Sequence, residues 1–302
     1  MFARIAVCAS SLGLAACAPP IQTLAPLPVA EQVTPQQWAE GCSQWDEWDK
    51  PAPPYLIHGS TYYVGTCGIS AILVAGEGGH LLIDTGTEAG GKVVLENIGK
   101  LGFRPEEIAS ILYSHEHFDH VGGHALVQEA SGAHIVSAPQ AVAVFSSGED
   151  HPEDPQFGMH EPMKPAKVDV IVHDGQTVRS ETAELTAIAT PGHSPGALSW
   201  QWTDCDTAGD CKTIVYADSL SPVSSDSYRF SDHPEYLAHY RHGLSRLRKI
   251  DCDILLTPHP SASGMVKRAA TGSLVGGMTC TQYADAVEAR LDKRLAKEAA
   301  GG

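Results

Sequence analysis

Four side chains that commonly bind metal ions stand within six consecutive residues. They belong to His115-Glu116-His117-Phe118-Asp119-His120, which directly follows the aliphatic run 108–113. In an extended segment, side chains two residues apart point the same way, so His115 and His117 can share one metal ion. Asp119 and His120 fall where the chain turns into a helix, and would face a second ion a few ångströms away. The spacing therefore predicts a site for two metal ions.

Two further histidines follow strand-like runs later in the chain. His193 lies in Thr190-Pro191-Gly192-His193-Ser194-Pro195-Gly196, and His259 lies in Leu255-Leu256-Thr257-Pro258-His259-Pro260. Proline and glycine on both sides hold each imidazole on a rigid turn. An ordinary polar residue at a strand end is the alternative for either one. Because the two histidines share this context, we expect both to complete the ligand set.

The segments 115–120, 190–200, 216–221 and 255–263 resemble the metallo-β-lactamases of subclass B3. The resemblance implies a single-domain, four-layer αββα sandwich of the α/β (α+β) class, with two Zn²⁺ ions at the sheet edge. On matching positions it implies that His115, His117 and His193 bind the first zinc, and that Asp119, His120 and His259 bind the second. Leu82-Ile83-Asp84-Thr85-Gly86 is similar to a turn of the superfamily whose aspartate, here Asp84, supports the metal site from behind the ligands.

This resemblance implies a zinc-dependent hydrolase that opens the β-lactam amide of penicillins, cephalosporins or carbapenems. Two zinc ions lower the pKa of bound water, so the nucleophile needs no protein base. Asp119 would ligate a metal and orient that nucleophile. The hydroxyls of Ser219 and Ser221 would meet the substrate carboxylate, with a polar strand end as their alternative.

Other functions of the same fold remain open at this point. In thioesterases and lactonases of the superfamily an aspartate bridges both metals, and Asp218 stands near that position. A glyoxalase II-like thioesterase or a lactonase is therefore the main alternative, and a non-catalytic zinc-binding lipoprotein is the alternative outside enzymology. Structural zinc sites are usually closed and cysteine-rich, which weighs against the lipoprotein.

Short aliphatic runs alternate with helical patterns along the chain, which predicts an α/β architecture. Strands are expected at residues 68–75, 80–83, 108–113, 134–137, 168–172, 185–189, 197–202, 213–217 and 253–256. Helices are expected at 90–101, 122–130, 234–250 and from about Thr281 onward. Residues 146–167 are rich in proline, glycine and acidic residues and predict a long irregular loop. Its Phe157 and Met159 either wall the cleft or lie on plain surface.

The charge balance excludes one large class of partner. The 302 residues carry 20 Lys and Arg against 36 Asp and Glu, for a formal charge of −16. Nucleic-acid enzymes draw much of their affinity from Lys and Arg contacts to phosphate. We therefore expect no nucleic-acid partner, and no obligate protein partner is evident.

The N-terminal segment has the features of an export signal. Arg4 precedes a twelve-residue apolar run that is too short to span a bilayer. The run ends in Leu14-Ala15-Ala16-Cys17, which resembles the lipobox of bacterial lipoproteins and would place a membrane lipid anchor on Cys17; ordinary cleavage nearby is the alternative. We expect a signal peptide at 1–17, a proline-rich tether at 18–36, a catalytic domain at 37–302, and a periplasmic protein.

Cysteine usage agrees with export. Cleavage before Cys17 leaves seven of the eight cysteines, and the six beyond Cys17 can pair in 15 ways. Cys205 and Cys211 flank a turn that a local disulfide would close. The resemblance to subclass B3 implies three disulfides, which join Cys42 with Cys67, Cys205 with Cys211, and Cys252 with Cys280.

Overall fold

Two facing β-sheets form the centre of the molecule. The computed structural model describes residues 33–301. The first sheet has seven strands in the order β1 (Tyr55–His58), β2 (Thr61–Tyr63), β3 (Ile72–Val74), β4 (His80–Ile83), β5 (Ile108–Leu112), β6 (His134–Ser137) and β7 (Val168–Ile171). Strands β1 to β4 pair antiparallel, whereas β4 to β7 pair parallel. Parallel pairing requires crossovers, and helices provide them.

The second sheet has five strands. Their order is β12 (Ile254–Leu256), β11 (Cys211–Tyr216), β10 (Leu198–Cys205), β9 (Glu184–Ala189) and β8 (Thr177–Arg179). All its pairings are antiparallel except that of β11 with β12. The main hydrophobic core fills the space between the sheets, where Trp200 and Ile72 are fully buried.

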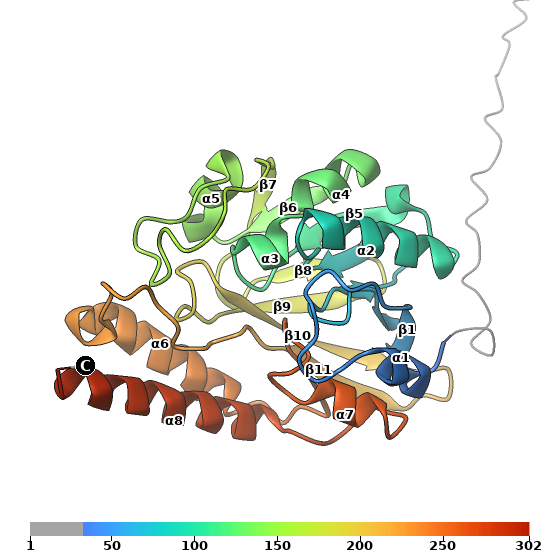
Figure 1. Ribbon diagram of the computed structural model, residues 1–302. Helices are drawn as coiled ribbons and strands as arrows, with labels where there is room; N and C mark the ends of the chain where they lie inside the picture. The colour runs from blue at the N-terminus through green and yellow to red at the C-terminus, as the bar shows by residue number, and fades with distance from the viewer. Residues whose placement is uncertain (1–32, 302) are drawn as a thin grey trace, which may run out of the picture.

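Helices cover the outer face of each sheet (Figure 1). On the first sheet lie α2 (Glu88–Lys100), α3 (Phe118–Val121), α4 (His124–Ser131) and α5 (Val142–Ser147). On the side of the second sheet lie α6 (Pro234–Leu247) and α8 (Cys280–Ala299), with α7 (Met265–Ala269) and α1 (Pro35–Gly41) nearby. Short 3₁₀ turns occupy Pro105–Glu107, Pro139–Ala141 and Phe230–Asp232. The expected αββα sandwich is confirmed.

Several element boundaries differ from the prediction. The expected strand 68–75 begins only at Ile72, because Thr66 and Ile69 close a tight turn before it (N–O 3.0 Å). The expected helix 122–130 corresponds to α4, which begins only at His124, because Gly122 and Gly123 separate it from the short helix α3 before it. The tether expected through residue 36 overlaps α1, which starts at Pro35 after a capping box formed by Thr34 and Gln37.

Three disulfides hold loops to this frame. Their pairs are Cys42–Cys67, Cys205–Cys211 and Cys252–Cys280, as the resemblance implied. The first ties the segment after α1 to the turn between β2 and β3, and the third ties the segment before β12 to the first residue of α8. Disulfides are typical of exported proteins. Within 33–301, no helix has the length and apolar character needed to cross a membrane.

Candidate metal centre

The predicted ligands follow the ends of three different strands. His115, His117, Asp119 and His120 come after β5, His193 after β9 and His259 after β12. A parallel or facing arrangement of strands brings such ends to one edge of the molecule. Asp84 follows β4, and Asp218 follows β11, at the same edge. The sandwich therefore gathers residues that are up to 175 positions apart in sequence.

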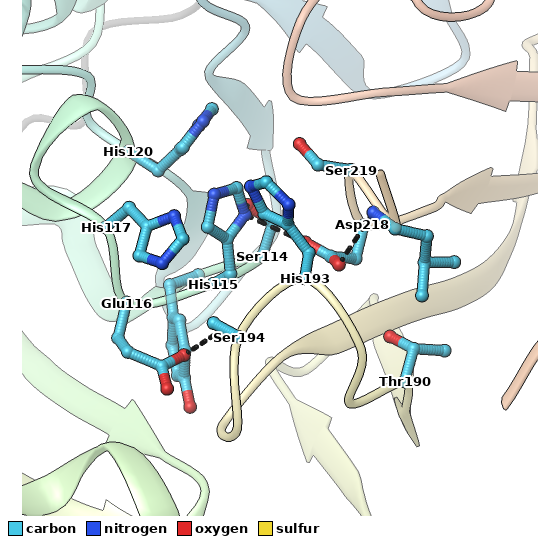
Figure 2. A network of polar contacts seen from close by, with 12 residues as sticks. Ser114, His115, Glu116, His117, His120, Thr190, His193, Ser194, Asp218 and Ser219 are labelled. Carbon is cyan, nitrogen blue, oxygen red and sulfur yellow. Dashed lines mark hydrogen bonds and ion pairs between the residues drawn. The ribbon is translucent and has the colours of Figure 1, made fainter. Parts of the chain in front are cut away.

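The donor atoms form two adjacent groups. In each of the groups His115–His117–His193 and His115–Asp119–His120, one ligand atom per residue lies within 4.8 Å of the others. His259 joins the second group, because its Nε2 is 3.4 Å from Asp119 Oδ2 and 3.3 Å from His120 Nε2. All six predicted ligands thus lie together (Figure 2 shows four of them).

In the first group, each histidine has one ring nitrogen engaged from behind. Asp218 Oδ1 is 2.8 Å from His115 Nδ1, Asp154 Oδ2 is 2.9 Å from His117 Nε2, and the carbonyl of Ser221 is 2.9 Å from His193 Nδ1. The other nitrogen of each ring is then the one available to a metal, and in His193 this Nε2 also lies 3.3 Å from Gln156 Nε2. His115 Nε2 is buried and has no hydrogen-bond partner among the described residues. An unpartnered buried imidazole nitrogen in such a setting fits a metal ligand.

The ionisation of these groups also fits a bound cation. Burial, together with the neighbouring histidines, holds the pKa of His115 well below its usual range, so its imidazole is neutral and free to bind metal. Burial raises the pKa of Asp218 well above the ordinary value and that of Asp154 to about 7. These two buried carboxylates lack a balancing positive charge, which a metal on the imidazoles in front of them would supply.

The second group concentrates negative charge around His120. Burial opposes the charged imidazole, but Asp119 and Asp84 outweigh it and raise the pKa of His120 to about 10. Likewise, burial opposes the charged carboxylate of Asp119, yet His120 brings its pKa well below the usual range. The fold therefore stabilises positive charge at this position, and a metal ion can replace the proton.

Asp84 organises the strand ends beneath His120. It has a left-handed backbone (φ 60°), which few non-glycine residues adopt. Its carboxylate accepts hydrogen bonds from Ser114 N (2.6 Å), Ser114 Oγ (2.7 Å) and Tyr216 Oη (2.7 Å), and lies 3.5 Å from His120 Nδ1. These bonds connect β4, β5 and β11 directly under the ligands.

Glu116 links the loop of the first ligands to the loop of His193 (Figure 2). Its buried carboxylate accepts hydrogen bonds from Ser194 Oγ (2.6 Å) and Gly196 N (2.7 Å). A Cβ at position 196 would lie 2.9 Å from Glu116 Oε1, so this approach requires glycine. Sequence reasoning did not identify Glu116 as a linking residue, although it is the middle residue of His-x-His.

A cavity of about 660 Å³ opens over both groups. The expected Ser219 and Ser221 line it beside His117, Asp119, His193 and His259. Sequence reasoning missed other residues that line the cavity, namely Trp45, Trp48, Gln156, His160 and Arg290. Phe157 and Met159 do not line it and are more than half exposed, because their neighbours Gln156 and His160 face inward instead.

Comparison with known proteins identifies the family. The model of the "Metallo-beta-lactamase superfamily" matches residues 64–259. The chain belongs to the metallo-β-lactamase superfamily. It is 51% identical to the solved "MIM-2 Metallo-Beta-Lactamase", with a TM-score of 0.84 over 88% of this chain and 98% of that one.

Other relatives refine this placement. The chain is 37% identical to MEM-A1, a subclass B3 metallo-β-lactamase from a soil metagenome library, with a TM-score of 0.81 over 85% of this chain and 100% of that one. It is also 30% identical to a hydroxyacylglutathione hydrolase of Serratia proteamaculans (strain 568), over 42% of this chain. The match spans only 41% of that hydrolase. The resemblance to subclass B3 is confirmed.

Proposed function

We propose that this protein hydrolyses the β-lactam amide bond of penicillins, cephalosporins or carbapenems with the help of two zinc ions. One observation carries the proposal: two adjacent groups of metal ligands lie against a cavity of about 660 Å³ in a chain that is 51% identical, over 88% of its length, to a metallo-β-lactamase. Nitrogen and carboxylate ligands without cysteine suit a catalytic zinc site.

His115, His117 and His193 would hold the first zinc, and Asp119, His120 and His259 the second. When bound, the zinc pair supplies a water-derived nucleophile at neutral pH and polarises the lactam carbonyl. Burial lowers the pKa of His115, His117 and His193, so the three imidazoles of the first group are neutral and able to bind metal. A carboxylate oxygen of Asp119 lies within 4.8 Å of a ring nitrogen of His115, a residue that belongs to both groups. In this position the Asp119 carboxylate would hold a proton of the attacking water.

The polar contacts of His193 argue against a serine nucleophile. Ser221 Oγ lies 3.0 Å from His193 Nδ1, a separation that would suit a serine–histidine pair. However, the Ser221 carbonyl lies 2.9 Å from the same nitrogen and can only accept a hydrogen bond. His193 Nδ1 must therefore carry the proton, and it cannot remove one from the Ser221 hydroxyl.

The position of Asp218 favours a β-lactam over a thioester substrate. A bridging aspartate would stand between the two ligand groups. Asp218 instead lies behind His115, where its Oδ1 meets Nδ1 at 2.8 Å and its Oδ2 accepts a hydrogen bond from Leu220 N (3.1 Å). The partial match to a hydroxyacylglutathione hydrolase makes a thioester the second candidate substrate.

Ser219 and Ser221 would bind the carboxylate of the substrate. Both line the cavity, and the turn that carries them is fixed by Tyr283 Oη, which donates to the carbonyls of Asp218 (2.8 Å) and Ser219 (2.7 Å). Leu220 between them has a left-handed backbone (φ 47°), which turns the two serines toward the same opening.

A single assay tests the proposed function. The zinc-loaded protein is offered a carbapenem, a penicillin and a glutathione thioester, each with and without a chelator. We expect ring opening of at least one β-lactam, loss of this activity after exhaustive chelation, and no effect of a clavulanate-like agent that traps serine. Turnover of the thioester alone would overturn the proposal in favour of the thioesterase, and full activity without metal would overturn the zinc mechanism.

We also propose that the protein acts in the periplasm, after cleavage of a signal peptide at or near Cys17. The three disulfides support an oxidising compartment. Cys17, the signal peptide and most of the expected tether lie outside the described residues. The intact mass of membrane-extracted protein tests this proposal, because a lipid on Cys17 adds mass to a chain that lacks residues 1–16. A cytosolic product that retains Met1 would contradict export.

A further inference from the structure

The loop between α5 and β7 is closed on itself and reaches into the metal centre. At the neck of the loop, where its two ends meet, Met163 N donates to Gly148 O (2.9 Å). On the opposite side of the loop, Ser225 N donates to Pro155 O (2.8 Å). Loops with adjoining ends of this kind are compact and often functional. Asp154 and Gln156 near its tip are buried, at 3% and 6% exposure, although most of the loop is on the surface.

Asp154 makes two contacts that fix its position. Its Oδ1 accepts a hydrogen bond from Gln156 N (2.7 Å), and its Oδ2 lies 2.9 Å from His117 Nε2. In its ionised form, which a bound cation favours, Asp154 only accepts hydrogen bonds, so Nε2 then carries the ring proton and Nδ1 is the nitrogen left for a metal. The His160 ring, from the same loop, packs 4.1 Å from the ring of His117. The loop thus holds the imidazole both at its edge and against its face.

We infer that Asp154 is a positioning residue of the first zinc site, which fixes the tautomer and orientation of His117. The inference rests on the metal ligands assigned above and not on the choice of substrate. Partners behind a ligating histidine typically change metal affinity by about 10- to 100-fold. The chain supplies this partner from a loop that sequence patterns mark only as irregular.

Asp150 offers a matched control in the same loop. It accepts a hydrogen bond from Gly158 N (2.8 Å) and lies 3.2 Å from His160 Nδ1, but it does not touch a ligand. We would compare Asp154→Ala, Asp154→Asn and Asp150→Asn by zinc competition with a chromophoric chelator. We expect Asp154→Ala to weaken one of the two zinc ions about 10- to 100-fold. Asp154→Asn should weaken it less, and Asp150→Asn should leave it within a few-fold of wild type.

Ring ¹H–¹⁵N spectra of the zinc-loaded proteins give a second readout, which loop packing alone would not change. The Nε2–H signal of His117 should be protected in wild type and Asp150→Asn, and shifted or fast-exchanging in both Asp154 variants. Wild-type zinc affinity and an unchanged Nε2–H signal in Asp154→Asn would overturn the inference, as would equal weakening by Asp150→Asn. Because Asp154→Asn preserves the size of the side chain, it decides the question even if Asp154→Ala does not fold.

A separate observation concerns Arg290 on α8. It is the only lysine or arginine that lines the cavity within residues 33–301, and its side chain has no ion pair or hydrogen bond there. The neighbouring Arg241 and Arg248 are instead paired with acidic residues of α8. A cation without a partner at a cavity wall is available to an anionic ligand.

The register of α8 directs Arg290 toward the substrate-binding turn. Tyr283 on this helix donates to Ser219 O, and Arg294 donates to Ser224 Oγ (2.7 Å). Position 290 lies between them on the same helix face, one turn before Arg294. Arg290 lines the same cavity as Ser219 and Ser221. We infer that Arg290 attracts the carboxylate of the substrate and contributes to specificity, which rests on the proposed β-lactamase activity.

The test compares each β-lactam acid with its methyl ester, in wild type, Arg290→Gln and the control Arg241→Gln. We expect Arg290→Gln to raise KM for the acid by a few-fold to about tenfold, with kcat nearly unchanged and no difference for the ester. Arg241→Gln should match wild type on both. Equal KM changes for acid and ester, or none, would overturn the role of Arg290 alone. Failure of wild type to open any β-lactam would instead count against the proposed function.

Discussion

The two ligand groups differ in how firmly the fold holds them. In the first, all three histidines are buried, and each is backed by a residue from a different segment: Asp218, Asp154 and Ser221. In the second, the side chain of His259 is 27% exposed at the cavity. Within residues 33–301, its Nδ1 has no hydrogen bond, and the ring of Trp48 packs 6.2 Å away.

This difference indicates that the fold holds the ligands of the first site more firmly than His259 in the second. All three imidazoles of the first group are held from behind, and their second nitrogens lie in one group of donors. In the second group the donor atoms of Asp119, His120 and His259 lie 3.0–3.4 Å apart, which is close to the ligand spacing around a tetrahedral zinc, but nothing within residues 33–301 holds the His259 ring from behind. We therefore expect the first zinc to bind more tightly than the second, and the predictions below test that order.

The largest effect should come from His115→Ala. His115 belongs to both groups, so its removal should empty the first site and disturb the second. The loss in kcat should exceed the roughly 100-fold upper range for partners behind a ligand. Steady-state kinetics and zinc content per chain measure it, with the exposed His134→Ala as control. Two retained zinc ions and a kcat within tenfold of wild type would contradict the comparison.

His259→Ala should separate the two sites. It removes one of three ligands from the second site only, so zinc per chain should fall from two towards one while the tighter ion stays. The kcat should fall strongly, because the remaining metal lacks its partner. Elemental analysis after dialysis against a mild chelator gives the answer. Two tightly held zinc ions in this variant would show that His259 is not a ligand of the second site. Asp218 would then be the candidate for the third ligand.

The six ligands could be predicted from sequence because short sequence patterns contain or surround each of them. The His115–His120 motif is contiguous, and proline and glycine flank His193 and His259 within rigid turns. The strands that carry these motifs are apolar runs, and their alternation with helical patterns predicted an α/β architecture, whereas the sandwich was implied by the resemblance to subclass B3. A tight turn delays the start of β3 to Ile72.

The residues behind and above the ligands could not be predicted in the same way. Asp154 and Gln156 sit in a loop without periodicity, and only the folded neck of that loop turns them inward. Arg290 looks like any charged residue of an amphipathic helix until its neighbours are known to be paired. Trp48 comes from the segment after α1, which a disulfide brings to the cavity. Each depends on contacts across the chain that no local pattern encodes.

Ser221→Ala should have a smaller and different effect. Its hydroxyl would contact the substrate, whereas its backbone carbonyl, which holds His193 Nδ1 at 2.9 Å, survives the substitution. The first site should thus keep its zinc. We expect KM to rise by a factor corresponding to about 1 kcal/mol, with kcat nearly intact. A covalent adduct on Ser221 in the wild-type enzyme, or loss of the first zinc from the variant, would contradict this division of roles.

Glu298→Gln should leave both ligand groups unchanged, because Glu298 contacts none of the six ligands. The variant therefore shows what the loss of a buried carboxylate does to stability alone. Glu298 accepts hydrogen bonds from Phe230 N (3.1 Å), Ser231 N (2.9 Å) and Arg294 Nε (2.8 Å). Although burial favours its neutral form, the Ser231 backbone and Arg294 bring its pKa to about 2 from the usual 4.5. The ionised form is therefore the one that stabilises the fold, and its contribution disappears as pH falls from about 4.5 towards 2.

The difference in unfolding free energy between wild type and Glu298→Gln should consequently depend on pH. Because Arg294 and this end of α8 are partly exposed to solvent, we expect about 1–2 kcal/mol at pH 7. The difference should shrink as the pH drops below about 4.5, because the carboxyl of the unfolded wild-type chain then takes up a proton while that of the folded protein stays ionised until about pH 2. Urea titrations of both proteins at pH 7, 4.5 and 3 measure this convergence, and zinc content at pH 7 should be the same in both. A pH-independent difference would show that Glu298 acts by packing, and a loss of zinc would show that stability at α8 is coupled to the metal groups.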